Sequence, residues 1–298
     1  MIRPLIVLVP VLVLGASTAL AHDPPNHDIE ELTERIAAHP SAPLLVERAE
    51  LWLQEGFADE AASDLRMAAT LEPGDAIGRA VLWAEVWRQR GRLDEAEAEL
   101  DPAVAAGSVE ALAARARIRA DAGRLTDALA DYEAAVARLL TVDLALGHGR
   151  TLERLGRPAE AEAVYAVHAR RLGNATVLVQ ARIQVLRQLR RHDDALRAID
   201  TQVRHARAKS TWLLLRGAVL AEAGRTEDAV RAYLAALADA ERVYRRRRSV
   251  ASRLIRAEAL AAVGRTAEAR AEAERVRAAS PQLAARATAL LAATEASR

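Results

Sequence analysis

A short phrase that recurs about every 34 residues constrains the fold of this 298-residue chain more than any other feature. In each copy a glycine is followed five residues later by an alanine, with at least one acidic residue between them. The complete copies begin at Gly56, Gly91, Gly123, Gly156, Gly224 and Gly264. A degenerate copy, residues 190–195, has an arginine in place of the glycine, and neighbouring copies lie 32 to 40 residues apart. Such regularity indicates repeated copies of one supersecondary unit.

The residues on both sides of each glycine follow helical spacing. The apolar stripes around Gly56 consist of Leu45, Ala49 and Trp52 before it, and of Ala61, Leu65 and Ala68 after it. A glycine suits the left-handed conformation that ends a helix, and acidic residues suit the first turn of the next helix. The composition agrees, because 51% of the residues are hydrophobic but only 3% are aromatic, and alanine and leucine favour helices. We therefore expect pairs of helices joined at the glycines.

This unit resembles the tetratricopeptide repeat, a helix–turn–helix motif of about 34 residues. The resemblance extends from about Ala42 to Pro281 and rests on four positions of the motif. These are the turn glycine, the alanine after it, a small residue in the first helix and a bulky residue in the second. The small residues are Ala49, Ala84, Ala116, Gly149, Gly217 and Ala257, and the bulky residues are Leu65, Leu100, Tyr132, Tyr165, Ile199 and Tyr233.

The resemblance implies an all-α fold, an α-solenoid of about seven stacked hairpins that form a right-handed superhelix. We expect the repeat array over residues 42–282, after an N-terminal tail and leading helix at residues 22–41 and before a capping helix at residues 283–298. The sequence departs from the motif where Arg190 replaces a turn glycine and where most final prolines are missing. The last interval has six extra residues, which predict a longer second helix that runs through Tyr244.

Residues 1–21 have the pattern of a secretory signal peptide. Arg3 precedes the apolar stretch from Leu5 to Leu14, and residues 19–21 supply a small-x-small cleavage site. We expect a mature chain that begins at His22 and is exported to the periplasm or the cell exterior, with an uncleaved anchor as the alternative. Because no later segment is apolar enough to span a bilayer, we expect no stable membrane insertion after cleavage.

The sequence has no recognisable pattern for catalysis or for a cofactor. It lacks cysteine, and it lacks the glycine-rich phosphate loops and the paired histidines of zinc enzymes. His148 occupies a position where other repeats carry arginine, which predicts a structural role. We therefore expect no enzyme, no cofactor and no metal site. One alternative remains open: the amine and imidazole of His22 could chelate copper(II) and give a role in metal handling.

The net charge of +1 conceals an asymmetry between the two halves of the chain. Residues 22–140 contain 12 arginines and 24 acidic residues, whereas residues 141–298 contain 29 basic and 17 acidic residues. Opposite charges on two parts of a long molecule favour weak self-association that salt would weaken. A 16-residue offset between the helices of one repeat also predicts two ion pairs, Arg48 with Asp64 and Arg115 with Asp131, each worth less than about 1 kcal/mol where exposed.

In the family that the sequence resembles, the first helices line the inner surface on which partner segments bind. The corresponding face passes from acidic to arginine-rich, and its residues are Glu50, Glu85, Arg88, Arg117, Asp121, Arg150, Arg154, Gln180, Gln184 and Arg187. Arginine binds carboxylates through two parallel hydrogen bonds. The resemblance thus predicts a non-catalytic protein-interaction scaffold or adaptor in the cell envelope, with an extended or acidic partner segment in this groove.

Two further features limit this interpretation. The Lys/Asn clamp of the cytosolic chaperone-binding members is absent, since Lys209 is the only lysine. The run from Arg245 to Arg248 has no interleaved aromatic residues, so we interpret it as a solvated helix end and expect no nucleic acid. The alternative function is an accessory role in an envelope process that involves a glycan or another polyanion.

Overall fold

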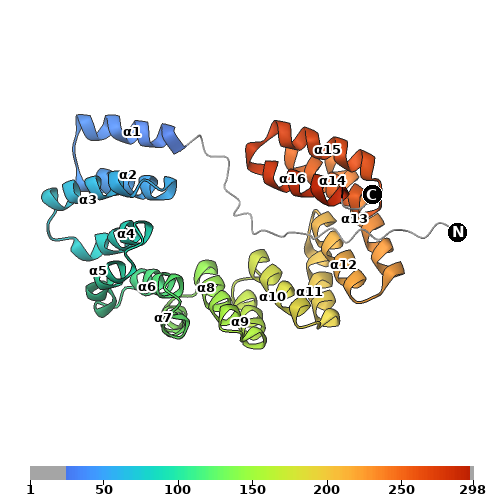
Figure 1. Ribbon diagram of the computed structural model, residues 1–298, viewed down its shortest axis with the longest axis horizontal. Helices are drawn as coiled ribbons and strands as arrows, with labels where there is room; N and C mark the ends of the chain where they lie inside the picture. Colours follow the sequence, from blue (N-terminus) through green and yellow to red (C-terminus); the bar gives the residue numbers. More distant parts are fainter. Residues whose placement is uncertain (1–24, 296–298) are drawn as a thin grey trace. The chain divides into compact units, whose positions relative to one another are not determined.

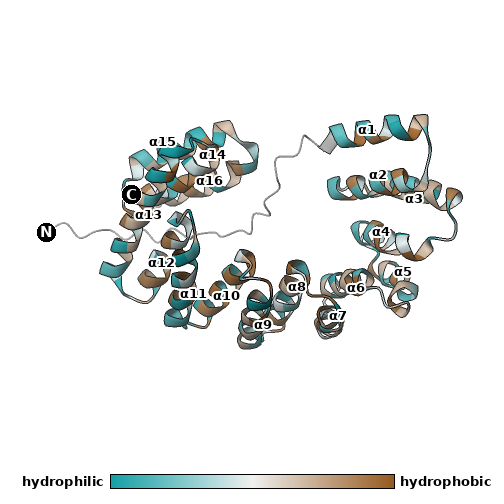
Figure 2. Cartoon of the chain, turned by 180° about the vertical axis from the view of Figure 1, so that it is seen from behind, coloured by the Kyte–Doolittle hydropathy of each residue, from teal (hydrophilic) through white to brown (hydrophobic). Residues whose placement is uncertain are grey.

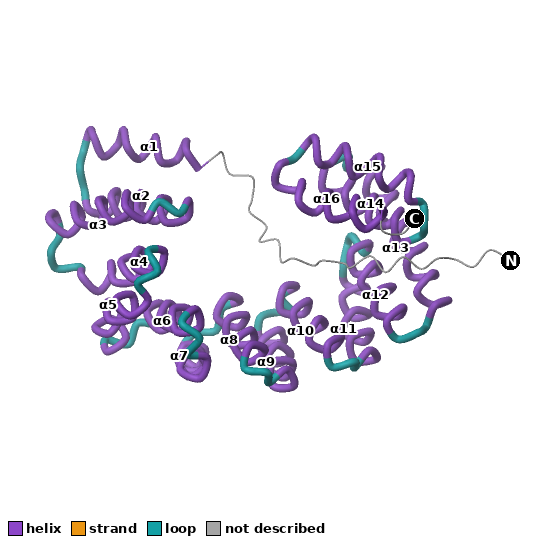
Figure 3. The backbone as a smooth tube through the Cα atoms, in the orientation of Figure 1, coloured by secondary structure: helices purple, strands orange, loops and turns teal. Residues whose placement is uncertain are grey.

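The computed structural model describes residues 25–295, which form sixteen α-helices and no strand (Figures 1 and 3). The first nine helices are α1 (Pro25–Ala38), α2 (Ala42–Glu55), α3 (Ala58–Leu71), α4 (Ala76–Gln89), α5 (Leu93–Ala105), α6 (Val109–Asp121), α7 (Leu125–Arg138), α8 (Val142–Arg154) and α9 (Pro158–Arg171). The others are α10 (Thr176–Gln188), α11 (His192–His205), α12 (Ser210–Glu222), α13 (Thr226–Arg246), α14 (Val250–Ala262), α15 (Thr266–Ala279) and α16 (Pro281–Glu295). The expected signal peptide at residues 1–21 and His22 lie outside the described residues.

The helices belong to two compact units, which are described separately. The N-terminal unit ends at Leu178, and the C-terminal unit begins at Val179 within α10. In the N-terminal unit α1 packs on α2, and the pairs α2–α3, α4–α5, α6–α7 and α8–α9 form hairpins that stack on one another. In the C-terminal unit α11 packs on α12, the pairs α12–α13 and α14–α15 form hairpins, and α16 packs on α15. The expected all-α solenoid of repeated hairpins is confirmed.

Each hairpin turns at the position that the repeated phrase predicts. Gly56 has a φ of +86°, and the amides of Gly56 and Phe57 donate to the last carbonyl groups of α2. Arg190 occupies the equivalent position after α10 with a φ of +57°. The amides of Arg190 and Arg191 donate to carbonyl groups of α10 in the same pattern. The degenerate repeat therefore keeps the turn, although a side chain disfavours this conformation by about 1–2 kcal/mol.

Replacing Arg190 by glycine is expected to stabilise the protein by about 0.5–1 kcal/mol. The substitution relieves the left-handed backbone strain, and the greater freedom of glycine in the unfolded chain offsets part of the gain. The matched control is Gly156→Ala, because Gly156 has a φ of +71° and open space around its Cα, so only the backbone conformation opposes the new methyl group. Urea unfolding should show opposite shifts for the two variants. An Arg190→Gly protein that is less stable than wild type would contradict the prediction.

The core lies where the apolar stripes of neighbouring helices meet. Brown and teal residues alternate along the helices in Figure 2, as amphipathic helices require. Ala49, Ala61 and Leu65 are fully buried in one cluster with Leu53 and Val86. Small residues at these positions bring the helices close together, and the next hairpin covers what one hairpin leaves exposed.

The later part of the array also follows the sequence. α13 has 21 residues and ends at Arg246, so the six extra residues lengthen the second helix of the sixth repeat as expected. α15 ends at Ala279, and Pro281 begins α16, because the fixed φ of proline suits the first turn of a helix.

Both predicted ion pairs are present, and the structure adds that their carboxylates are buried. Arg48 donates from Nε and Nη2 to the two oxygens of Asp64 at 2.8 and 2.7 Å. Arg115 likewise donates from Nε and Nη2 to the two oxygens of Asp131 at 3.0 and 2.9 Å. Each aspartate is only 5% exposed. The limit of about 1 kcal/mol expected for an exposed pair therefore does not apply to either of them.

Candidate functional site

The first helices of the N-terminal unit place one residue of each repeat at the same edge of the solenoid. Glu50, Glu85, Arg117 and Arg150 lie six residues before their turn glycines on α2, α4, α6 and α8. Each follows a buried small residue that packs inside the solenoid. α4 contacts α2, and α6 contacts both α4 and α8. Two acidic and two basic side chains therefore follow one another from repeat to repeat.

Three recesses open along these helices, and together we call them the groove. The basic recess, of about 500 Å³, is lined by Arg88, Arg117, Ala120, Asp121, Tyr132, Asp143, Leu146, Gly147, Arg150, Thr151 and Arg154. The apolar recess, of about 300 Å³, is lined by Val81, Val109, Glu110, Ala113, Arg117, Tyr132, Leu139, Thr141, Asp143 and Leu144. The acidic recess, of about 310 Å³, is lined by Glu50, Leu53, Gln54, Val81, Leu82, Glu85 and Arg117. Because Arg117 lines all three, the recesses adjoin one another.

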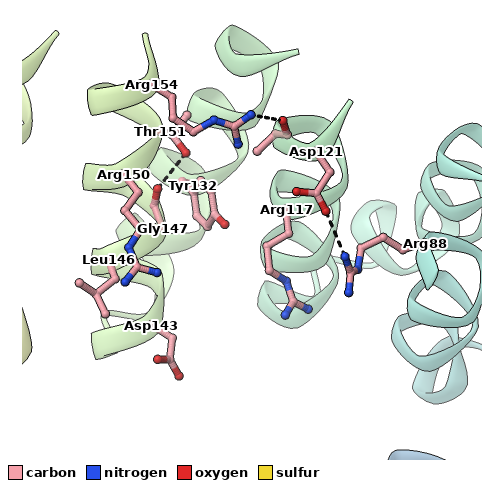
Figure 4. A pocket seen from close by; sticks show the side chains of 11 residues that line it. Arg88, Arg117, Asp121, Tyr132, Asp143, Leu146, Gly147, Arg150, Thr151 and Arg154 are labelled. Carbon is pink, nitrogen blue, oxygen red and sulfur yellow. Dashed lines mark hydrogen bonds and ion pairs between the residues drawn. The ribbon is translucent and has the colours of Figure 1, made fainter. Parts of the chain in front are cut away.

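Two of the arginines in the basic recess are engaged within the protein. Arg88 donates to both oxygens of Glu85 at 2.6 and 2.8 Å and reaches Asp121 at 3.2 Å. Arg154 donates from Nη2 to the carbonyl oxygen of Ala120 at 2.7 Å (Figure 4). The second bond ties the end of α8 to the end of α6. These two arginines link neighbouring repeats within the basic recess.

The other two arginines of this recess are available to a ligand. Arg117 and Arg150 are exposed, and neither forms an ion pair with any residue in the described part of the chain. Figure 4 shows the ring of Tyr132 between them. Burial raises the pKa of the Tyr132 hydroxyl, so it stays protonated and can donate a hydrogen bond. The recess thus offers two free guanidinium groups and a neutral hydroxyl.

The acidic recess has the opposite character. Glu50 is exposed and forms no ion pair within residues 25–295. Burial opposes the ionisation of Glu85, but hydrogen bonds from Arg88 and Gln89 outweigh it and lower the pKa of this carboxyl. Glu85 is therefore ionised at neutral pH. This end of the groove is negative although Arg117 reaches its edge.

Seven of the ten residues predicted from the sequence line this groove, and three lie elsewhere. Gln180, Gln184 and Arg187 belong to α10 in the C-terminal unit. There Arg187 donates to Gln184 at 2.7 Å and, through Nε, to Glu222 at 2.9 Å. Its charge is thereby balanced inside the unit, which distinguishes it from Arg117 and Arg150.

The sequence reasoning missed the apolar recess and the tyrosine. Tyr132 comes from the second helix α7, and Leu139 follows the end of that helix. Val81 and Leu144 come from the early turns of first helices. The site predicted from the sequence comprised only polar residues on the exposed face of the first helices, and these four residues do not belong to that face. The available signal was the polar hydroxyl of Tyr132 at a motif position where the first two repeats carry leucine.

The other candidates from the sequence do not add to this site. Arg245 and the three arginines after it are exposed at the end of α13, and Arg253 and Arg256 of α14 lie against the ring of Tyr244. Within residues 25–295 no group of three or more histidine, aspartate or glutamate residues is placed to hold a metal ion. None of the helices in this range is both long and apolar enough to cross a bilayer.

A pair of buried histidines lies beside the groove in the fourth repeat. His148 on α8 and His168 on α9 are 8% and 6% exposed, and Nδ1 of His148 lies 3.4 Å from Nε2 of His168. Glu133 approaches Nε2 of His148 at 3.9 Å. Burial lowers the pKa of both rings, and nearby His148 and Arg171 lower that of His168 further. The expected structural role of His148 agrees with this burial.

We expect the free energy of unfolding to fall as the pH drops below about 6.5. In that range the unfolded chain binds protons at these two histidines that the folded protein does not, so acid favours unfolding. The slope is at most about 1.4 kcal/mol per pH unit for each ring. Urea unfolding at pH 7.5 and pH 5.5 should show a smaller loss for the His148→Gln/His168→Gln variant than for wild type. Equal losses in both proteins would contradict the prediction.

The fold and the groove together define a helical-hairpin repeat protein with three adjoining recesses along its first helices. The sequence model of the tetratricopeptide repeat matches residues 82–139, 113–175 and 181–242, which cover more than half of the chain. The chain therefore belongs to the tetratricopeptide repeat family. No curated protein matches it significantly by sequence.

Solved structures show the same fold. Yeast Tom70 is 14% identical, with a TM-score of 0.59 over 91% of this chain, which spans 59% of the Tom70 chain. The pilF protein of Pseudomonas aeruginosa is 16% identical, with a TM-score of 0.50 over 74% of this chain and 94% of that chain. At such identities the likeness concerns the fold alone. Proteins of this family generally serve as protein-interaction scaffolds.

Proposed function

We propose that this protein is a non-catalytic scaffold of the cell envelope that binds an acidic segment of a partner protein in the groove. The observation that carries the proposal is the pair of guanidinium groups without an ion pair, Arg117 and Arg150, in a recess lined by four arginines and only two aspartates. Each can bind a carboxylate through two hydrogen bonds. The signal-like residues 1–21 support export, and the family supports a role in binding rather than catalysis.

Site-specific crosslinking tests the proposal directly. A photoreactive amino acid at Ala113, which lines the apolar recess, should crosslink to a protein partner in cells of the source organism. Reversing both charges, Arg117→Glu with Arg150→Glu, should abolish that crosslink, because carboxylates would then meet carboxylates. The matched control is Arg66→Glu with Arg170→Glu, which changes the same number of charges at exposed positions outside the groove.

Two results would contradict the proposal. A crosslinked partner that persists in the Arg117→Glu/Arg150→Glu protein would show that the groove does not hold it through these arginines. Binding of a purified anionic glycan, lost in the same variant and unaccompanied by any protein crosslink, would favour the alternative role in a polyanion process. A free guanidinium pair attracts either class of anion, so only the nature of the ligand separates them.

A further inference from the structure

We infer that the groove recognises an ordered set of side chains: an acidic residue in the basic recess, an aliphatic residue in the apolar recess and a basic residue in the acidic recess. This inference rests on the proposed function and specifies the chemistry of the partner segment. Its basis is that the apolar recess shares lining residues with both of the others: Arg117, Tyr132 and Asp143 with the basic recess, and Val81 and Arg117 with the acidic recess.

Arg117 and Arg150 bind the acidic residue of the ligand in this arrangement. Asp121 is paired with Arg88 at 3.2 Å and forms no ion pair with either of these two arginines. Asp143 is exposed at the start of α8 and leaves the recess with an excess of positive charge. A ligand carboxylate between the two arginines would also accept a hydrogen bond from the hydroxyl of Tyr132 (Figure 4).

The apolar recess, which adjoins the basic recess, holds the aliphatic residue of the ligand. Its apolar walls are Val81, Val109, Ala113, Leu139 and Leu144. Leu139 is 46% exposed, and a ligand side chain in this recess would cover it. The recess shares Arg117, Tyr132 and Asp143 with the basic recess. The aliphatic residue therefore lies next to the acidic one.

The acidic recess, with Glu50 and Glu85, holds the basic residue of the ligand. Glu85 is ionised but already bound by Arg88, whereas Glu50 is exposed and has no cationic partner among the described residues. A ligand arginine or lysine would supply that partner. An all-acidic ligand would instead bring a carboxylate against Glu50, so this recess opposes purely anionic ligands.

The spacing follows from helix packing. The acidic recess is formed mainly by α2 and α4, and the basic recess mainly by α6 and α8. Packed helices lie about 8–10 Å apart, so the two recesses are about 15–20 Å apart. An extended peptide advances about 3.3 Å per residue, which places the acidic and basic residues about five residues apart.

Fluorescent peptides with a glycine and serine background provide the test, and fluorescence anisotropy provides the affinity. The mixed probe has Glu, Leu and Arg in this order, with Glu and Arg about five residues apart, and it is used with its reversed sequence because a peptide can enter in either direction. The mixed probe should bind about two- to fivefold more tightly than an all-acidic probe that has Glu in place of Arg. Replacing its Leu by Ser should weaken binding about tenfold.

A charge swap in the protein makes the test specific. Glu50→Arg should reverse the preference, so that the all-acidic probe binds more tightly than the mixed probe. The matched control is Glu47→Arg, an exposed substitution on the same helix outside the recesses, which should leave the preference unchanged. A preference that Glu50→Arg does not reverse, or an equal affinity of wild type for the two probes, would overturn the inference.

The outcomes separate this inference from the proposed function. If the probes bind without regard to order while the partner crosslink still depends on Arg117 and Arg150, the ordered recognition is wrong and the scaffold function stands. If neither the probes nor the crosslink respond to Arg117→Glu with Arg150→Glu, both are wrong.

Discussion

Replacing Asp131 by alanine is expected to lower the free energy of unfolding by about 2–4 kcal/mol. Its carboxylate is 5% exposed and accepts hydrogen bonds from Arg115 at 2.9 and 3.0 Å and from Arg119 at 2.8 Å. Removing one partner of a buried ion pair leaves the other charge without compensation. The estimate is below the usual maximum because Arg119 keeps Glu97 at 2.7 Å and Arg115 keeps Asp101 at 3.4 Å.

Urea unfolding of the purified protein measures this loss. The matched control is Asp59→Ala, which deletes a carboxylate that is 86% exposed and pairs with Arg90 between neighbouring repeats. Loss of such an exposed pair should lower the free energy of unfolding by less than about 1 kcal/mol. If Asp131→Ala costs no more than Asp59→Ala, the buried Arg115–Asp131 pair does not stabilise the fold as the structure indicates.

The Arg115–Asp131 pair could be predicted from the sequence, but its energy could not. The 16-residue offset correctly identified Arg115 and Asp131 as partners, because it is the distance between facing positions of two helices in one repeat. Asp131 is also held by Arg119 from the next turn of α6, and Arg119 pairs with Glu97 of α5 in the preceding repeat. The burial of Asp131 and the contact with Glu97 depend on how the hairpins pack, which has no fixed offset in the sequence, so the larger energy could not be predicted.

The groove, too, could be predicted from the sequence only in part. Helical periodicity was enough to place Glu50, Glu85, Arg117 and Arg150 on one edge, since each repeats the same position of the motif. It did not show which arginines are free. Arg88 and Arg187 each have a partner on their own helix and another in the next repeat, and the second kind has no fixed spacing: Asp121 lies 33 residues from Arg88, and Glu222 lies 35 residues from Arg187. The apolar recess was missed because its residues come from several helices and a loop.

The second large effect concerns Gly149, at the small position of the first helix in the fourth repeat. A Cβ at Gly149 would lie 2.2 Å from atoms Cε1 and Cζ of Tyr165. Tyr165 is fully buried, and its hydroxyl donates to Glu153 at 2.8 Å, so the ring cannot easily move. Gly217 meets the ring of Tyr233 in the same way at 2.3 Å, whereas the first two repeats pair alanine with leucine. In the third repeat, which pairs Ala116 with Tyr132, it is Gly147 of the next helix whose Cβ would meet the tyrosine ring, at 2.4 Å. The missing side chain at Gly149 therefore makes room for the ring of Tyr165.

We expect Gly149→Ala to destabilise the protein by about 2–3 kcal/mol, since the steric cost exceeds the gain of up to about 1 kcal/mol in helix propensity. The matched control is Gly78→Ala in α4, where the new methyl group would meet only the side chain of Asp75, which is 59% exposed and has solvent to turn into, although it would then leave its 3.7 Å pair with Arg79. That control should be neutral or slightly stabilising in the same urea titration.

The decisive comparison is made in a Tyr165→Leu background, which restores the alanine–leucine pairing of the first two repeats. There Gly149→Ala should become neutral or stabilising by up to about 1 kcal/mol, so the sign of its effect reverses. A loss of 2 kcal/mol or more in both backgrounds would show that the ring of Tyr165 is not what excludes a side chain at Gly149. Reversal would show that Gly149 and Tyr165 are energetically coupled, because the tyrosine ring occupies the space that a side chain at Gly149 would need.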